Sequence, residues 1–145
     1  MFARKLKLKL GEILLQIAPL SSEQLKEVLV LQESLSPPRP IGEILVEKGY
    51  IKKEDVETAL GIQQGYPYIC VSHYKIDPKL MRKAPLDLMW KLNFIPLDLL
   101  GDVLTVAVAS IAYKTTILEE LKTYKVRIFI SNHKEIQEIL RSYSG

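Results

Sequence analysis

The side chains that could do chemistry in this chain of 145 residues are few and scattered. The two histidines, His73 and His133, lie far apart, and neither stands at a metal-ligand spacing from carboxylates. The single cysteine, Cys70, lies in an apolar run, and one cysteine excludes an internal disulfide and a cysteine-based zinc site. Asp98 and Asp102 flank a Leu-Gly pair, where aspartates usually form a turn rather than an acid/base pair. The sequence therefore predicts no catalytic residues, no metal, no cofactor and no enzyme.

Phosphate-binding loops are also missing from the sequence. It contains neither G-x-x-x-x-G-K-[ST] nor G-x-G-x-x-G. The net charge is only +3, and it is not gathered as in a nucleic-acid-binding protein. The exception is the first ten residues, where Arg4, Lys5, Lys7 and Lys9 meet no acidic residue. Two interpretations remain open, a solvated N-terminus or an arm that contacts phosphate or an acidic partner.

The composition, 48% hydrophobic and 26% charged, is typical of a soluble globular protein. Its apolar runs are far shorter than the ~20 residues that span a bilayer, and the first residues lack the apolar stretch of a secretory signal. We therefore expect a cytoplasmic protein without a membrane span.

An internal repeat is the most informative pattern in the chain. Residues 9–32 align with residues 40–63 without a gap, at an offset of 31, and seven of the 24 positions are identical. Two unrelated amphipathic helices would match by chance at apolar positions, but not also at Gly, Glu and Gln. The identical pairs are Gly11/Gly42, Glu12/Glu43, Ile13/Ile44, Leu14/Leu45, Glu23/Glu54, Leu29/Leu60 and Gln32/Gln63. Five further pairs exchange one aliphatic residue for another: Leu10/Ile41, Leu15/Val46, Leu20/Ile51, Leu25/Val56 and Leu31/Ile62.

Each copy has the pattern of a helix–turn–helix. Apolar residues over 10–17 follow helical spacing, and Pro19 ends that helix. Ser21 and Gln24 form a capping box for the next helix, and Gly49 supplies the equivalent break in the second copy. A proline-rich linker over 34–40 separates the copies. We expect the aliphatic positions of both copies to be core.

The remaining residues predict a small sheet with helices. Apolar runs at 94–99 and 103–109, joined by Gly-Asp, indicate a hairpin, and 126–130 a third strand. Thr116 and Glu119 suggest a capping box that opens a helix, and Asn132 with Glu135 suggests the cap of a last helix. The predicted fold class is α+β, with a helical subdomain over 1–65 built from the two repeats, then an α+β subdomain over 66–145 with a small mixed sheet and packed helices.

The repeated glycines and glutamines need an account beyond packing. A glycine inside a helix destabilises it, whereas the N–H groups near a helix start favour an anion. Gln32 and Gln63 stand at equivalent helix ends. Their recurrence suggests a ligand with two equivalent halves.

The repeat resembles the paired motif of the MshEN domain, found at the N-terminus of type II secretion and type IV pilus assembly ATPases. That motif reads approximately R-L-G-x-x-L…L-x-x-x-L-x-x-Q, twice. The resemblance continues through Tyr66-Pro67-Tyr68-Ile69, Ile76-Asp77-Pro78, Pro96-Leu97 and Leu104-Thr105-Val106-Ala107, and covers about residues 9 to 140.

The resemblance implies that the chain binds cyclic di-GMP, a two-fold symmetric dinucleotide. Two positions depart from the family motif, because Lys9 and Pro40 stand where it has arginine, although Arg39 precedes Pro40. Arginine presents a planar fork to phosphate that lysine lacks. The ligand-binding residues that the resemblance implies are Lys9, Leu10, Gly11, Leu14, Gln32, Arg39, Ile41, Gly42, Leu45 and Gln63.

The resemblance further implies a non-catalytic regulatory domain of a secretion or pilus ATPase system. The partner would be an inner-membrane platform protein, which would place the chain at the inner membrane only through that partner. The alternative is a docking module that binds this partner without nucleotide. Full-length family members carry a P-loop ATPase domain after this region, and the sequence leaves open whether the chain is a fragment of a longer one.

Overall fold

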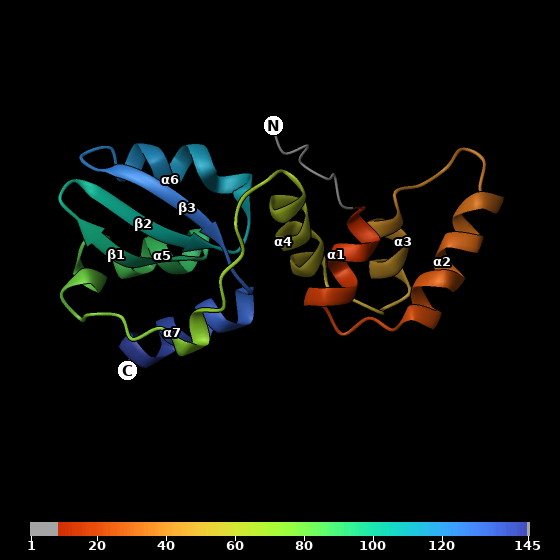
Figure 1. The fold of residues 1–145 in the computed structure, drawn as a ribbon, viewed down its shortest axis with the longest axis horizontal. Helices are drawn as coiled ribbons and strands as arrows, with labels where there is room; N and C mark the ends of the chain where they lie inside the picture. Colours follow the sequence, from red (N-terminus) through yellow and green to blue (C-terminus); the bar gives the residue numbers. More distant parts are fainter. Residues whose placement is uncertain (1–8, 145) are drawn as a thin grey trace, which may run out of the picture.

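The computed structural model describes residues 9–144, which form a helical half followed by a sheet with packed helices (Figure 1). The predicted α+β class is confirmed. Arg4, Lys5 and Lys7 of the basic N-terminal segment lie outside the described residues. The helices and strands are α1 (Leu10–Ile17), α2 (Ser22–Ser34), α3 (Ile41–Glu47), α4 (Lys53–Gln63), α5 (Leu86–Leu92), β1 (Phe94–Leu100), β2 (Val103–Val108), α6 (Lys114–Glu120), β3 (Lys125–Ile130) and α7 (His133–Ser144), with short 3-10 turns η1 (Val71–His73), η2 (Leu80–Arg82) and η3 (Ile111–Tyr113).

Local sequence signals set the helix boundaries in the helical half. The Ser21 hydroxyl accepts from the Gln24 N–H at 3.1 Å, and the Gln24 side chain accepts from the Ser21 N–H at 3.0 Å, so the predicted capping box is confirmed. Helix α1 ends at Ile17, just before Pro19. Gly49, with φ 76°, occupies the left-handed region after α3, as a residue without a Cβ does most easily. Both spans expected to be helical, 10–17 and 54–63, are helical.

The two glycines of the repeat let the helices of each copy approach closely. A Cβ on Gly11 would lie 3.1 Å from Leu25 Cδ1, and a Cβ on Gly42 would lie 3.0 Å from Val56 Cγ1. The two pairs are equivalent, since Leu25 and Val56 are also offset by 31. The copies interlock, because α1 packs against α4 and α2 packs against α3. The glycines therefore have a packing role whether or not a ligand binds.

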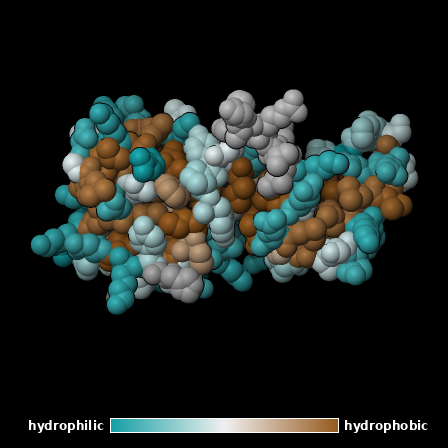
Figure 2. Space-filling model, viewed as in Figure 1, coloured by the Kyte–Doolittle hydropathy of each residue, from teal (hydrophilic) through white to brown (hydrophobic). Residues whose placement is uncertain are grey.

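The expectation that the aliphatic repeat positions are core is wrong for three of them. Leu15 is 36% exposed, Leu29 41% and Leu60 39%. Each helix carries more apolar residues than one face can bury. The core takes Ile13, Leu14, Val28 and their counterparts, and the surplus reaches the surface. Figure 2 shows apolar side chains at the surface over the helical half.

The sheet has the order β1-β2-β3 and is mixed, as predicted. Strands β1 and β2 form the expected antiparallel hairpin, with Gly101 at φ 61° in its turn. Strand β3 runs parallel to β2, and α6 makes the crossover between them. In Figure 1, α6 lies on one side of the sheet, and α5 and α7 lie on the other.

Of the two caps predicted in the second half, the one at Thr116 differs in the structure. Helix α6 begins at Lys114, so Thr116 lies inside it and does not cap it. The hydroxyl of Ser110 accepts from the Ala112 N–H at 3.1 Å and starts the turn η3, which leads straight into α6. Asn132 does cap α7, accepting from the Lys134 N–H at 2.8 Å. Glu135, however, accepts from the Ser72 N–H at 3.1 Å.

The two halves meet through α4, which lies between them in Figure 1. The Thr58 hydroxyl, 2% exposed, donates to the Ala109 carbonyl at 2.9 Å. A Cβ on Gly61 would lie only 2.6 Å from Ile130 Cδ1, so this glycine seats α4 against the end of β3. Within residues 9–144, none of the helices has the length and apolar character needed to cross a membrane.

Candidate functional site

A groove of about 440 Å³ runs between α3 and α4, on the outer side of the second repeat. Its floor is apolar, because Gly42 leaves space beside Val46 and Val56, and Leu60 extends the surface. Its remaining lining residues are Arg39, Glu43, Glu47, Lys53 and Glu57. An apolar floor with a charged rim suits the flat face and polar edge of an aromatic ring system.

The charged rim of this groove is internally paired. The Arg39 guanidinium donates to Glu47 Oε2 at 2.6 Å and lies 3.9 Å from Glu43 Oε1. The hydrogen bond from Arg39 holds the pKa of the Glu47 carboxyl below its usual range, and Glu47 in turn raises the pKa of Arg39. The rim has three carboxylates, with Glu57, against the two cations Arg39 and Lys53. It therefore disfavours an anion unless Arg39 is released from Glu47.

The first repeat has an equivalent apolar face. Leu15 and Leu29 occupy the positions of Val46 and Leu60, and both are exposed. At the positions of Glu47 and Glu57 the first repeat has Gln16 and Lys26, so its rim is less acidic. The molecule thus presents two related apolar faces, of which the first is the more favourable for an anion.

The structure brings some of the predicted ligand-binding residues to the groove. Arg39 and Gly42 line it, and Leu10 contacts Gly42, since its Cδ2 would lie 3.7 Å from a Cβ there. Gln32 is half-buried and donates to the Arg39 carbonyl at 2.8 Å, so it fixes the backbone that carries the guanidinium. Lys9 is exposed at the residue before α1.

Other predicted ligand-binding residues lie away from this surface. Leu14 and Leu45 are 0% exposed and form the centre of the helical core, so neither offers a surface to a ligand in this conformation. Ile41 is half-buried against the same core, and Gly11 is buried beneath Leu25. Gln63 is half-buried at the last position of α4.

Sequence reasoning missed the residues that make the apolar faces. Leu15 and Val46 stand outside the i, i+3, i+4, i+7 set of their helices, so helical periodicity alone could have assigned them to a second face. For Leu29 and Leu60 no such signal exists, because both fit the predicted core stripe. The acidic rim could have been inferred from the differences between the copies at the positions of Glu47 and Glu57.

Comparisons with known proteins agree with this fold. The family model of the MshEN domain matches residues 64–145. The type IV pilus assembly ATPase PilB of Myxococcus xanthus (strain DK1622) is 25% identical over 137 residues, which is 93% of this chain but 24% of PilB. A solved structure of MshE with cyclic di-GMP aligns at TM-score 0.60 and 22% identity, over 94% of this chain and 99% of that one. The N-terminal domain of XpsE aligns at TM-score 0.54 and 16% identity, over 97% and 98%.

Proposed function

Since the chain belongs to the MshEN domain family, we propose that it is a non-catalytic regulatory domain of a type II secretion or type IV pilus ATPase system that binds cyclic di-GMP. The chain spans about a quarter of the length of PilB, so ATP hydrolysis in such a system would belong to residues outside the matched region. The MshE neighbour carries the same dinucleotide.

The observation that supports this proposal most is the recurrence of one surface in both repeats. The pairs Leu15/Val46 and Leu29/Leu60 give each copy a partly exposed apolar face. Cyclic di-GMP has two identical halves, each with one guanine and one phosphate. Two equivalent faces can therefore take one guanine each, with the phosphates between them.

The polar partners follow from the residues beside the faces. Arg39 and Lys9 precede the first helix of each copy and would supply positive charge to the phosphates. The amides at Leu10, Gly11 and their counterparts belong to the first helical turn, where N–H groups have no partner within the helix. Gln63 and Gln32 stand at the far end of the second helix of each copy and would reach a guanine edge.

Calorimetric titration with cyclic di-GMP tests this function. Leu29→Ser and Leu60→Ser each remove a leucine that is 41% or 39% exposed, so circular dichroism must first show that each variant is folded. Covering the exposed fraction of one leucine is worth roughly 0.6–1.2 kcal/mol, so each variant should weaken binding about threefold to eightfold. The matched control is Leu100→Ser, which removes a leucine 71% exposed on the sheet and should bind like the unchanged chain. Equal affinity in all three variants would exclude these faces as the site.

The acidic rim favours a second candidate function. Glu43, Glu47 and Glu57 oppose the dianionic ligand, and Lys9 and Pro40 replace the arginines of the family motif. If the chain shows no calorimetric response to cyclic di-GMP, the docking function takes its place. The apolar faces would then contact the cytoplasmic part of an inner-membrane platform protein, and Leu29→Ser would weaken that complex instead.

A further inference from the structure

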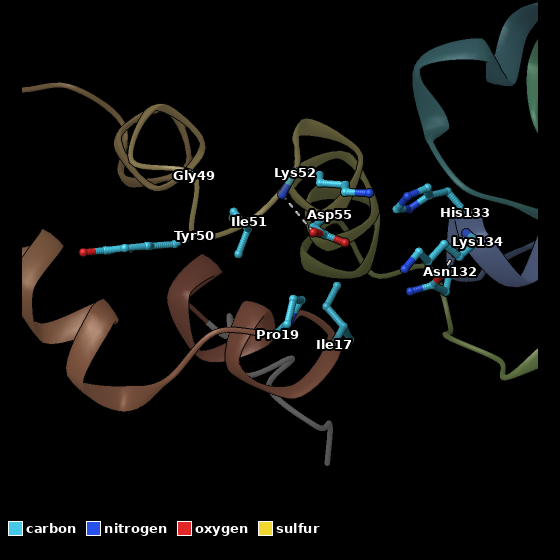
Figure 3. A pocket seen from close by; sticks show the side chains of 10 residues that line it. All are labelled: Ile17, Pro19, Gly49, Tyr50, Ile51, Lys52, Asp55, Asn132, His133 and Lys134. Atoms are coloured by element: carbon cyan, nitrogen blue, oxygen red, sulfur yellow. Dashed lines mark hydrogen bonds between the residues drawn. The ribbon is translucent and has the colours of Figure 1, made fainter.

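A second pocket lies at the junction of the two halves, away from the groove just described. It has a volume of about 230 Å³ and is lined by the start of α4, the start of α7 and the turns before α2 and α4 (Figure 3). Lys52 and Asp55 face it from the helical half, and Asn132, His133 and Lys134 face it from the other half. Its apolar wall consists of Ile17, Pro19 and Ile51.

His133 is a buried polar side chain without a partner in this pocket. The residue is only 7% exposed, and its Nδ1 has no hydrogen-bond partner in the described part of the chain. Its imidazole points into the pocket, toward the end of the Lys52 side chain (Figure 3). Leaving a buried polar atom unpaired destabilises a fold, so such an atom points to a water, an ion or a ligand.

Charged groups of both signs line the pocket together with the imidazole. Lys52 and Lys134 contribute two ammonium groups, and the N-terminus of α7 adds the partial positive charge of its helix dipole. Asp55 contributes one carboxylate, 7% exposed, whose Oδ2 accepts from the Lys52 N–H at 3.0 Å. The pocket therefore offers donors for an anion together with two acceptors, the Asp55 carboxylate and the His133 Nδ1.

We propose that this pocket binds inorganic phosphate, which keeps a P–OH hydrogen near neutral pH, whereas a phosphomonoester has largely lost it. The ammonium groups take its charged oxygens, and the P–OH donates to Asp55 or to His133. The volume is below the roughly 300 Å³ typical of sites for drug-sized ligands, so a dinucleotide does not fit. Cyclic di-GMP is excluded on chemistry as well, because its phosphodiesters carry no P–OH.

The acceptors make the site selective between oxyanions of similar size. Phosphate near neutral pH retains at least one hydrogen, which it can donate to the Asp55 carboxylate. Sulfate has no hydrogen to donate, so it and the carboxylate would repel each other as two negative charges. Because Lys52 belongs to the helical half and Lys134 to the other, a bound phosphate would also tie the two halves together. This pocket is separate from the groove between α3 and α4, so the phosphate proposal and the cyclic di-GMP proposal can each be refuted without affecting the other.

Titration with inorganic phosphate, followed by NMR of the His133 imidazole, tests the proposal. The chain has two histidines, so His133→Gln assigns the signal. At fixed pH, with chloride keeping the ionic strength constant, phosphate should shift this signal saturably with a dissociation constant of about 1 mM or below. Sulfate should bind at least about tenfold more weakly, and cyclic di-GMP should leave the signal unchanged.

Three variants separate this site from general charge attraction. Lys52→Gln should weaken phosphate binding about tenfold, whereas Lys53→Gln, the neighbour that faces the groove instead, should not. Asp55→Asn retains an acceptor for the Lys52 N–H and should raise sulfate affinity toward that of phosphate. A linear, non-saturating shift, equal affinity for sulfate and phosphate, or equal losses in Lys52→Gln and Lys53→Gln would overturn the proposal.

Discussion

Gly61 lets α4 of the helical half pack closely against Ile130 at the end of β3, and Gly61→Ala tests that contact. The new Cβ would lie 2.6 Å from Ile130 Cδ1 and 3.0 Å from Ile130 Cγ1. Ordinary contacts are 3.4–4 Å, and Ile130 is 0% exposed, so the isoleucine cannot swing into solvent. Overpacking of this kind costs about 1–3 kcal/mol, while alanine gains about 1 kcal/mol of helix propensity over glycine. We expect a net loss of about 1 kcal/mol in the free energy of unfolding.

Ile130→Val removes Cδ1, the nearer of the two Ile130 atoms that the new Cβ would strike. This variant alone should lose about 0.5–1.5 kcal/mol, the usual result of deleting one buried methyl group. In the Ile130→Val background the helix propensity gain is no longer offset by the Cδ1 contact. Gly61→Ala should then be neutral or stabilising, which gives a coupling of about 1 kcal/mol between the two positions.

Urea denaturation of the four members of this cycle measures the coupling, with circular dichroism following the helices and intrinsic fluorescence of Trp90, in α5, following the other half. If Gly61→Ala changes the free energy of unfolding equally in both backgrounds, α4 does not seat on Ile130 as described. If circular dichroism and Trp90 fluorescence give different urea midpoints only in Gly61→Ala, the substitution has uncoupled the unfolding of the two halves rather than weakened either core.

Four further outcomes follow from other contacts. Ser21→Ala should lose about 0.5–2 kcal/mol in the free energy of unfolding through the α2 cap, while Ser22→Ala, its exposed neighbour, should change it little. Thr58→Val should lose about 1–3 kcal/mol in urea denaturation, because the Ala109 carbonyl is left without its buried donor. Lys9→Arg should strengthen cyclic di-GMP binding up to about tenfold by calorimetry, and an unchanged affinity beside a loss in Lys9→Ala would show that lysine already suffices. The hydrogen bonds from Lys48 and Tyr50 lower the pKa of the Glu27 carboxyl. The stability that they add is therefore present above the ordinary glutamate pKa of about 4.3, and it is lost as the pH falls through the lowered value. In Glu27→Gln the melting temperature should fall less steeply as the pH is lowered.

The parts of this fold that could be predicted from the sequence are those decided by neighbours in the chain. The Ser21–Gln24 capping box, the Gly49 break and the Gly101 turn depend on a few adjacent dihedral angles, and each was predictable from residue type. The start of α6 was not, because a capping-box pattern at Thr116 competes with Ser110, which starts the preceding turn earlier. When two nearby residues could each cap a helix, the sequence alone does not show which one does, because the surrounding packing decides.

The candidate site was only partly predictable for a different reason. The repeat makes Gly42 visible and the family resemblance indicates Arg39, whereas the exposure of Leu29 and Leu60 depends on how α1 to α4 pack together. The junction pocket could not be predicted from the sequence, because Asp55 and His133 are 78 residues apart in the chain. They line one pocket only when α4 packs against the other half.

The differences between the two repeat copies explain why only the second copy, through α4, packs against the sheet half. Two positions shared by both copies, Gly42 of α3 and Leu60 of α4, line the groove. The face of α4 that contacts the sheet half carries two positions that differ between the copies, Thr58 and Gly61, whose counterparts in α2 are Glu27 and Val30. Val30 is 68% exposed, and a valine at Gly61 would collide with Ile130. The glycine at this position of α4 thus lets the second copy of the repeat pack against the sheet, whereas the valine at the equivalent position of the first copy would not fit there.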